Sequence, residues 1–210
     1  MHPTHITAHL AEATRPINPD ATPDIHPEIA RLNWNYDPYH NALRPILPRV
    51  QEFVSAIIRK EPPRWLSLLG PSGVGKTHIL KQAMSALRAA HSRGAWSIKT
   101  STGWRGPQMA HIIPAEDLSD WKAPKDYARY DVIYIEDIGS GALMDKGAGG
   151  VITSRIKELL QLRSGKWTML CANLYRGEIE TAMDGRIASR LKRDGSTCIE
   201  IPADVPDFWG

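Results

Sequence analysis

The sequence lacks any long apolar run, and this absence limits where the protein can act. No segment of its 210 residues approaches the roughly 18 consecutive apolar residues that a membrane-spanning helix needs. The first stretch, from Met1 to Asp20, contains histidine and proline but has no apolar core of the kind that secretory signals carry. We therefore expect a cytoplasmic protein that does not associate with a membrane.

Cysteine is scarce, which argues against disulfides and structural zinc. The two cysteines, Cys171 and Cys198, lie in apolar runs typical of strands, so we expect buried thiols in a reducing compartment. They are too few for a zinc site of the usual spacing. Scattered histidines in a flexible segment, here His2, His5 and His9, seldom bind a metal. The net charge of +3 is mild and neither requires nor excludes a nucleic-acid partner.

Short apolar runs alternate with segments of helical spacing, as in an α/β domain. The length suits one such domain, and repeated prolines near the start predict that residues 1–35 form a flexible extension before a domain at 36–210. This alternation favours a five-stranded parallel sheet covered by helices on both faces. The predicted helices are 45–60, 77–91 and 151–162, and the predicted strands are 65–69, 111–115, 131–135, 167–172 and 197–201.

The strongest motif is a phosphate-binding loop. Its chemistry requires glycines that let backbone amides face phosphate oxygens, a lysine that neutralises their charge, and a hydroxyl that reaches Mg²⁺. A glycine turn with an incidental lysine is the alternative, but the motif lies between a predicted strand and a predicted helix, where a phosphate loop belongs. The predicted nucleotide-binding residues are Gly70, Pro71, Ser72, Gly73, Val74, Gly75, Lys76, Thr77 and His78.

Two acidic residues, Glu136 and Asp137, directly follow the apolar run 132–135. Parallel sheets bind ligands at the carboxyl ends of their strands, so both side chains are expected near the phosphate loop. One would hold Mg²⁺ through water, together with Thr77, and the other would orient or deprotonate an attacking water. A solvated strand end is the alternative, which the preceding phosphate loop disfavours.

These motifs resemble the AAA+ ATPases of the bacterial helicase-loader (DnaC) and transposition-helper (IstB) family. The resemblance covers Asn33 to Ile201 and includes the Gly-Lys-Thr-His loop and the acidic pair followed by Ile138-Gly139. The run 167–174 is similar to the family's sensor strand, and 184–191 is similar to its arginine-finger box. The resemblance implies a P-loop NTPase fold, namely an AAA+ core without the C-terminal lid. The twenty residues after Arg190 are too few to form such a lid.

The resemblance also assigns roles to individual residues. Glu136 takes the metal position and Asp137 the position that activates water, whereas the family usually has Asp first and Asp or Glu second. The shorter aspartate predicts slow hydrolysis, because a misplacement near 1 Å can cost about 100-fold. Asn173 would contact the γ-phosphate, unless it only caps a loop. Arg190, with Arg186 as second candidate, would act on a neighbour's ATP in a homo-oligomer, unless both lie on a solvated helix face.

The segment 95–108 departs from the family's pattern. Its tryptophans and cations, Trp96, Lys99, Trp104 and Arg105, are candidates for DNA contact. A β-hairpin that packs its tryptophans inward is an equally good interpretation. Lys146 is a further basic candidate for DNA contact.

A second departure lies between Asp117 and Arg129. This segment leaves little room for the helix pair that initiators and loaders carry before the acidic strand.

The predicted function is an ATP- and Mg²⁺-dependent ATPase that loads a replicative helicase onto DNA. A transposition helper that assembles on duplex DNA with a transposase is the alternative within the same family. The loop also resembles that of guanylate kinase, which lacks the long segment before the loop, and a nucleotide-gated scaffold without turnover is a further class. The adenine pocket is not evident; Tyr39 to Asn41 is a guess from the resemblance.

Overall fold

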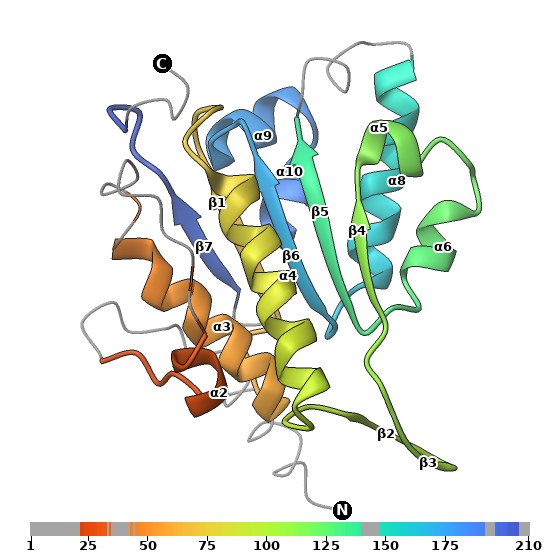
Figure 1. Ribbon diagram of the computed structural model, residues 1–210. Helices are drawn as coiled ribbons and strands as arrows, with labels where there is room; N and C mark the ends of the chain where they lie inside the picture. Colours follow the sequence, from red (N-terminus) through yellow and green to blue (C-terminus); the bar gives the residue numbers. More distant parts are fainter. Residues whose placement is uncertain are drawn as a thin grey trace, which may run out of the picture.

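A five-stranded parallel sheet forms the centre of the molecule (Figure 1). The computed structural model describes residues 22–32, 34, 43, 45–139, 148–191 and 196–205. The strand order is β4-β5-β6-β1-β7, so the predicted sheet is confirmed. Its strands are β1 (Trp65–Leu69), β4 (Met109–Ile112), β5 (Val132–Ile138), β6 (Trp167–Ala172) and β7 (Thr197–Glu200).

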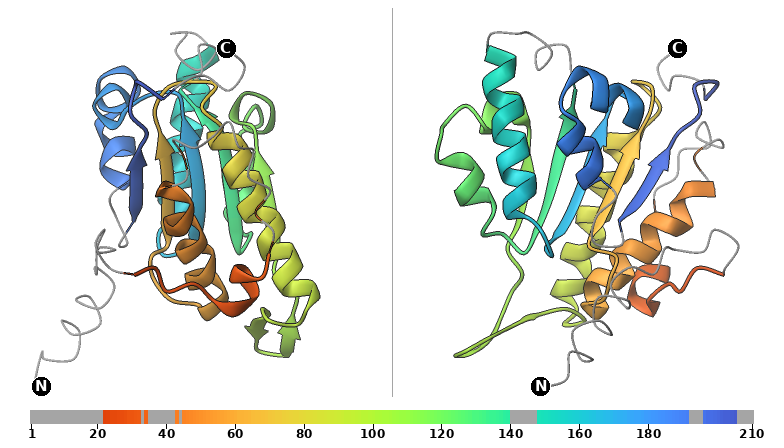
Figure 2. Two further views of the ribbon diagram at one scale, coloured as in Figure 1. Left: turned by 60° about the vertical axis from the view of Figure 1, so that its left-hand side comes forward. Right: turned by 180° about the vertical axis from the view of Figure 1, so that it is seen from behind.

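Helices cover both faces of this sheet, which explains why its strands are apolar on both sides. One face packs side chains such as Leu66 and Met169 against α3 (Leu47–Arg59) and α4 (Lys76–Ser92). The other packs side chains such as Ile133 against α8 (Ala148–Leu162), α9 (Arg176–Ala182) and α10 (Gly185–Arg190). Figure 2 shows the two helical layers from the side and from behind. Within the described part of the chain, every helix is too short or too polar to span a bilayer.

The packed core begins before the predicted boundary at residue 36. Helix α2 (Pro27–Ala30) buries Ile29 completely, and the indole of Trp34 donates a hydrogen bond to the carbonyl of Ile29 (3.2 Å). Repeated prolines predicted a flexible segment here, and this is wrong for 27–30. Pro27 stands in the first turn of the helix, where its missing N–H is not needed. Residues 1–21, with the three histidines, and Tyr39 to Asn41 lie outside the described residues.

The segment before β5 differs in detail from its prediction. A hairpin of β2 (Ile98–Thr100) and β3 (Gly103–Arg105) precedes β4, and Figure 1 shows it extending beyond the end of the sheet opposite the carboxyl ends of the strands. Strand β4 ends earlier than predicted, because Pro114 begins the short helix α5 (Pro114–Asp117). A second short helix, α6 (Ala123–Tyr127), fills the remaining space before β5.

Candidate nucleotide-binding site

The loop between β1 and α4 has the backbone of a phosphate cradle. Gly70, Gly73 and Gly75 all have positive φ angles, of 135°, 77° and 91°, which other residues adopt only with strain. A side chain on Gly70 would also lie 2.7 Å from the carbonyl oxygen of Ile201. Helix α4 begins directly after Gly75 and has no capping side chain, so its first N–H groups are available to an anion.

Lys76 lies at the centre of this loop and is 5% exposed. Its ammonium group donates hydrogen bonds to the carbonyl oxygens of Gly70 (2.9 Å) and Pro71 and to Oδ1 of Asn173 (2.9 Å). Burial lowers the pKa of Lys76, while Cys171 and Asp137 act in the opposite direction. A phosphate would therefore meet a poorly hydrated cation that is held at the floor of the loop.

A chain of hydrogen bonds connects Lys76 to the acidic strand end. The amide of Asn173, at the end of β6, accepts from Lys76 and donates to Oδ1 of Asp137 (2.6 Å). Asp137 has a φ of 51° at a register shift between β5 and β6, and its N–H points to the sulfur of Cys171 (3.4 Å). We call Lys76, Asn173 and Asp137 the polar relay; it joins three elements at the carboxyl ends of the strands.

Glu136 is held separately from the polar relay. Its carboxylate lies 2.5 Å from Nε2 of His111 and 3.2 Å from the ammonium group of Lys81. The His111 ring stacks on Tyr134 with centroids 4.7 Å apart. His111 and Lys81 were not predicted as site residues, although His111 is on β4, next to the acidic strand, where the carboxyl ends of parallel strands meet.

The fit for magnesium depends on Thr77 and Glu136, both predicted as ligands. The Thr77 hydroxyl lies 3.8 Å from the sulfur of Cys171, at the start of α4. No cluster of three or more His, Cys, Asp or Glu side chains suited to a metal occurs in the described part of the chain. Magnesium beside a nucleotide needs no such cluster, because it takes one or two protein oxygens and completes its shell with phosphates and water. The donors present therefore fit Mg²⁺ bound together with a nucleotide.

Asp137 provides a test in which stability and activity change in opposite directions. Burial raises the pKa of Asp137, with Lys76 lowering it and Glu136 adding to the rise. The folded state therefore disfavours the charged carboxylate, and stability is lost as pH rises from the ordinary pKa of an aspartate through the raised one. Asp137→Asn should raise the Tm at pH 7 in a thermal melt without nucleotide and, if Asp137 activates the attacking water as predicted from the sequence, should also slow phosphate release from ATP. A lower Tm, or unchanged turnover, would contradict this assignment.

Comparison with known proteins identifies the fold. No family model matches the sequence, and no curated protein matches it. Among solved structures, DnaI is 17% identical with a TM-score of 0.55 over 86% of this chain and 89% of that chain. Domain III of the Thermotoga maritima replication initiation protein DnaA is 18% identical, with a TM-score of 0.55 over 86% of this chain and 70% of that chain. The fold is that of the AAA+ P-loop proteins.

A third solved structure of similar fold was determined with a bound nucleotide analogue. The replication initiator DnaA bound to AMPPCP and single-stranded DNA is 16% identical, with a TM-score of 0.50 over 74% of this chain and 46% of that chain. At such identities the likeness extends to the fold alone. The expected AAA+ fold is thereby confirmed, and it is a fold that binds nucleotides in a similar structure.

Arg186 and Arg190, the two arginine-finger candidates, lie on α10, which covers the face of the sheet turned toward the viewer in the right-hand view of Figure 2. The guanidinium of Arg190 contacts its own α8, through Oε1 of Gln161 (3.2 Å) and the carbonyl of Lys157 (3.5 Å). Arg186 is exposed. Its backbone N–H donates to Asp184 (2.6 Å), which caps the helix and pairs with Lys157. The described side-chain contacts of Arg190 are thus with α8, on the other side of the sheet from Lys76.

The four candidates for DNA contact differ in exposure and in charge pairing. Trp96 is 1% exposed and packs in the core, so it cannot stack on a base, which corrects its prediction. Arg105 forms an ion pair with Asp131 (2.6 Å), which already neutralises its charge. Trp104, which is 64% exposed, and Lys99, which is exposed, stay candidates for DNA contact. The predicted hairpin with inward tryptophans is thus correct for one tryptophan. Lys146 lies outside the described residues.

Proposed function

We propose that this chain is an AAA+ ATPase that binds ATP with Mg²⁺, hydrolyses it slowly, and acts in DNA replication by loading a replicative helicase. The observation that carries the proposal is the polar relay, which places a buried cation, an amide and a carboxylate in one hydrogen-bonded chain beside the loop. A glycine turn with an incidental lysine would have no reason to bury the ammonium group or to connect it to an acid. The replication initiation proteins of similar fold support the choice of process.

Each residue of the relay has a chemical task in this proposal. Lys76 exchanges its contacts with Gly70, Pro71 and Asn173 for oxygens of the β- and γ-phosphates. The amide of Asn173 is then released to orient the γ-phosphate and the attacking water, whose proton Asp137 accepts. Bound Mg²⁺, held by Thr77 and through water by Glu136, would neutralise the charge that develops on the phosphates.

Slow turnover follows from the geometry of the acidic pair. Asp137 reaches one methylene less far than a glutamate, and its carboxylate already accepts a hydrogen bond from Asn173. The longer Glu136 is held by His111 and Lys81, so it serves the metal and not the attacking water. The bond to Asn173 must be rearranged before Asp137 can act as a base, which adds to the barrier.

Assembly completes the site in this proposal, since the relay contains no arginine. Arg190, or Arg186 as the second candidate, would be presented to the ATP of a neighbouring copy and stabilise charge on the transferred phosphate. Specific ATPase activity should then rise with protein concentration, and Arg190→Ala should lower it while nucleotide binding persists. A specific activity that is constant over a wide concentration range would argue against a shared site.

The experiment that tests the function is a capture from the native host in ATP and Mg²⁺. The tagged chain should retain a replicative helicase, and Lys76→Ala should lose it. Recovery of a transposase instead would identify the transposition helper. Phosphate release is measured in parallel, with and without a chelator of Mg²⁺. ADP formation without a phosphorylated acceptor excludes a kinase, and retention of the helicase without any turnover would leave a nucleotide-gated scaffold.

A further inference from the structure

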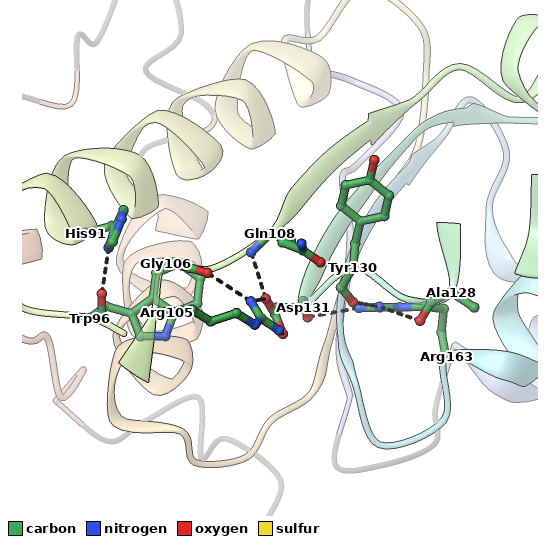
Figure 3. Close-up of polar contacts among 9 residues, drawn as sticks. All are labelled: His91, Trp96, Arg105, Gly106, Gln108, Ala128, Tyr130, Asp131 and Arg163. Carbon is green, nitrogen blue, oxygen red and sulfur yellow. Dashed lines mark hydrogen bonds and ion pairs between the residues drawn. The ribbon is translucent and has the colours of Figure 1, made fainter. Parts of the chain in front are cut away.

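The hairpin β2–β3 is held rigidly, although it extends away from the sheet. At its base the Trp96 side chain is buried, and the carbonyl of Trp96 lies 2.9 Å from Nδ1 of His91 (Figure 3). The guanidinium of Arg105 donates two hydrogen bonds to Asp131, of 2.6 and 2.9 Å. Asp131 also accepts from the backbone N–H of Gln108 (2.7 Å). These contacts fix both strands at the point where the hairpin leaves the domain.

This rigid hairpin presents an aromatic ring to solvent. Trp104 is 64% exposed, and the ammonium group of Lys60, at the end of α3, lies 4.8 Å from the centre of its ring. Lys99, which is exposed, pairs directly with Trp104 in the register of the two strands. An exposed tryptophan adds little to the stability of the fold. Trp104 is therefore held on a rigid hairpin with Lys60 over its ring and Lys99 on the neighbouring strand, an arrangement that favours a role in binding a ligand.

A second aromatic–cation pair is joined to the first. The Arg64 guanidinium stacks on Trp167 at 4.5 Å and donates to the carbonyl of Lys60 (3.1 Å). Both pairs are at the amino-terminal end of the strands, since Arg64 directly precedes β1 and Trp167 begins β6. Asp131 is already paired with Arg105, and the one acid between Lys60 and Arg64 in the sequence is the exposed Glu61, so the cations outnumber the acids at this end.

We propose that this aromatic–basic end, formed by Lys60, Arg64, Lys99 and Trp104, binds single-stranded nucleic acid. Trp104 would stack on a base, and the cations would contact the phosphates on either side, as sequence-tolerant strand binding requires. An acidic peptide would satisfy the cations but would leave the indole face without a partner. The proposal rests on the replication role for the class of partner, but it needs no bound ATP, because this end lies opposite the phosphate loop (Figure 1).

A matched pair of tryptophans makes the test specific. Trp121 is 65% exposed and has Lys122 at 5.2 Å from its ring. It stands, however, among the acids Asp117, Asp120 and Asp126 in the α5–α6 segment. Binding of a fluorescent oligothymidine is measured by anisotropy over a series of salt concentrations. Trp104→Ala should weaken binding about tenfold, Trp104→Phe should retain most of it, and Trp121→Ala should bind as the unaltered chain does.

Charge and nucleotide dependence give two more readouts. Lys99→Ala should reduce the slope of log affinity against log salt by about 1, and Lys76→Ala should leave oligonucleotide binding intact. Equal affinities for Trp104→Ala and Trp121→Ala, binding that is lost in Lys76→Ala, or no binding by the unaltered chain would each overturn the proposal. Strand binding that depends on Trp104 in a chain without ATPase activity would instead contradict only the proposed function. Thermal melts of both tryptophan variants should match that of the unaltered chain.

Discussion

Lys76→Ala is expected to lower the affinity for ATP by about 100-fold or more, since charged hydrogen bonds to two phosphates are lost. The loop would retain its glycines and the amino-terminal end of α4, so a weak affinity for anions should persist. The carbonyls of Gly70 and Pro71 would lose their donor, as would Oδ1 of Asn173. The half-buried carboxylate of Asp137 would also lose the cation that lowers its pKa.

Retention of a fluorescent ATP analogue, titrated with Mg²⁺ present, measures this loss. Arg88→Ala is the matched control, because Arg88 is an exposed cation further along the same helix and should leave retention unchanged. Thermal melts without nucleotide separate misfolding from loss of the ligand contact, since a folded Lys76→Ala chain still melts cooperatively. Retention close to that of the unaltered chain would remove the basis of the proposed function.

The sheet and the positions of the polar relay could be predicted because the signals are local. Buried parallel strands are continuous apolar runs, and β1, β6 and β7 begin where those runs begin. Lys76 follows β1, Asp137 is near the end of β5, and Asn173 follows β6. All three lie at the same end of the sheet, because a parallel sheet gathers the carboxyl ends of its strands there. The relay therefore follows from topology once the motifs are recognised.

The rest depends on contacts between residues that are distant in the sequence. The register shift near Asp137 arises from the pairing of β5 with β6, which no local pattern encodes. Glu136 is held by side chains from two other elements, β4 and α4. Trp96 and Trp104 stand eight positions apart in segments of similar composition, yet one is buried and the other exposed. The Arg105–Asp131 ion pair at the base of the hairpin likewise joins residues that are 26 positions apart.

Arg163 is the clearest example of a residue whose environment no local sequence pattern predicts. It follows α8 in a polar run, 163–166, that looks like a solvated helix end, yet it is 0% exposed. Its five hydrogen bonds go to the carbonyls of Ala128, Tyr130, Asp131 and Trp167 and to the Thr168 hydroxyl (Figure 3 shows the first three carbonyls). Burial lowers the pKa of this guanidinium to about 9, so it remains charged at pH 7.

Arg163→Met should therefore destabilise the fold by about 3 to 5 kcal/mol, because buried carbonyls lose a charged donor that an apolar side chain cannot replace. For a chain of this length the loss lowers the Tm by about 10 °C, measured by circular dichroism. Lys166→Met is the control: Lys166 also donates to the carbonyl of Ala128 (2.7 Å) but is exposed, so its cost should stay below about 1 kcal/mol. Equal losses of Tm in the two variants would show that Arg163 is not the centre of this network.

The position of Arg163 also connects this stability to the hairpin. Asp131 accepts from Arg163 through its backbone carbonyl (3.1 Å) and from Arg105 through its carboxylate. Loss of Arg163 should therefore loosen the support of Trp104 as well as the start of β5. Below its lowered Tm, Arg163→Met should bind the oligonucleotide more weakly than Lys166→Met does, while retention of the ATP analogue stays similar in the two. A loss of ATP retention in Arg163→Met that equals its loss of oligonucleotide binding would indicate general unfolding and not a loosened hairpin.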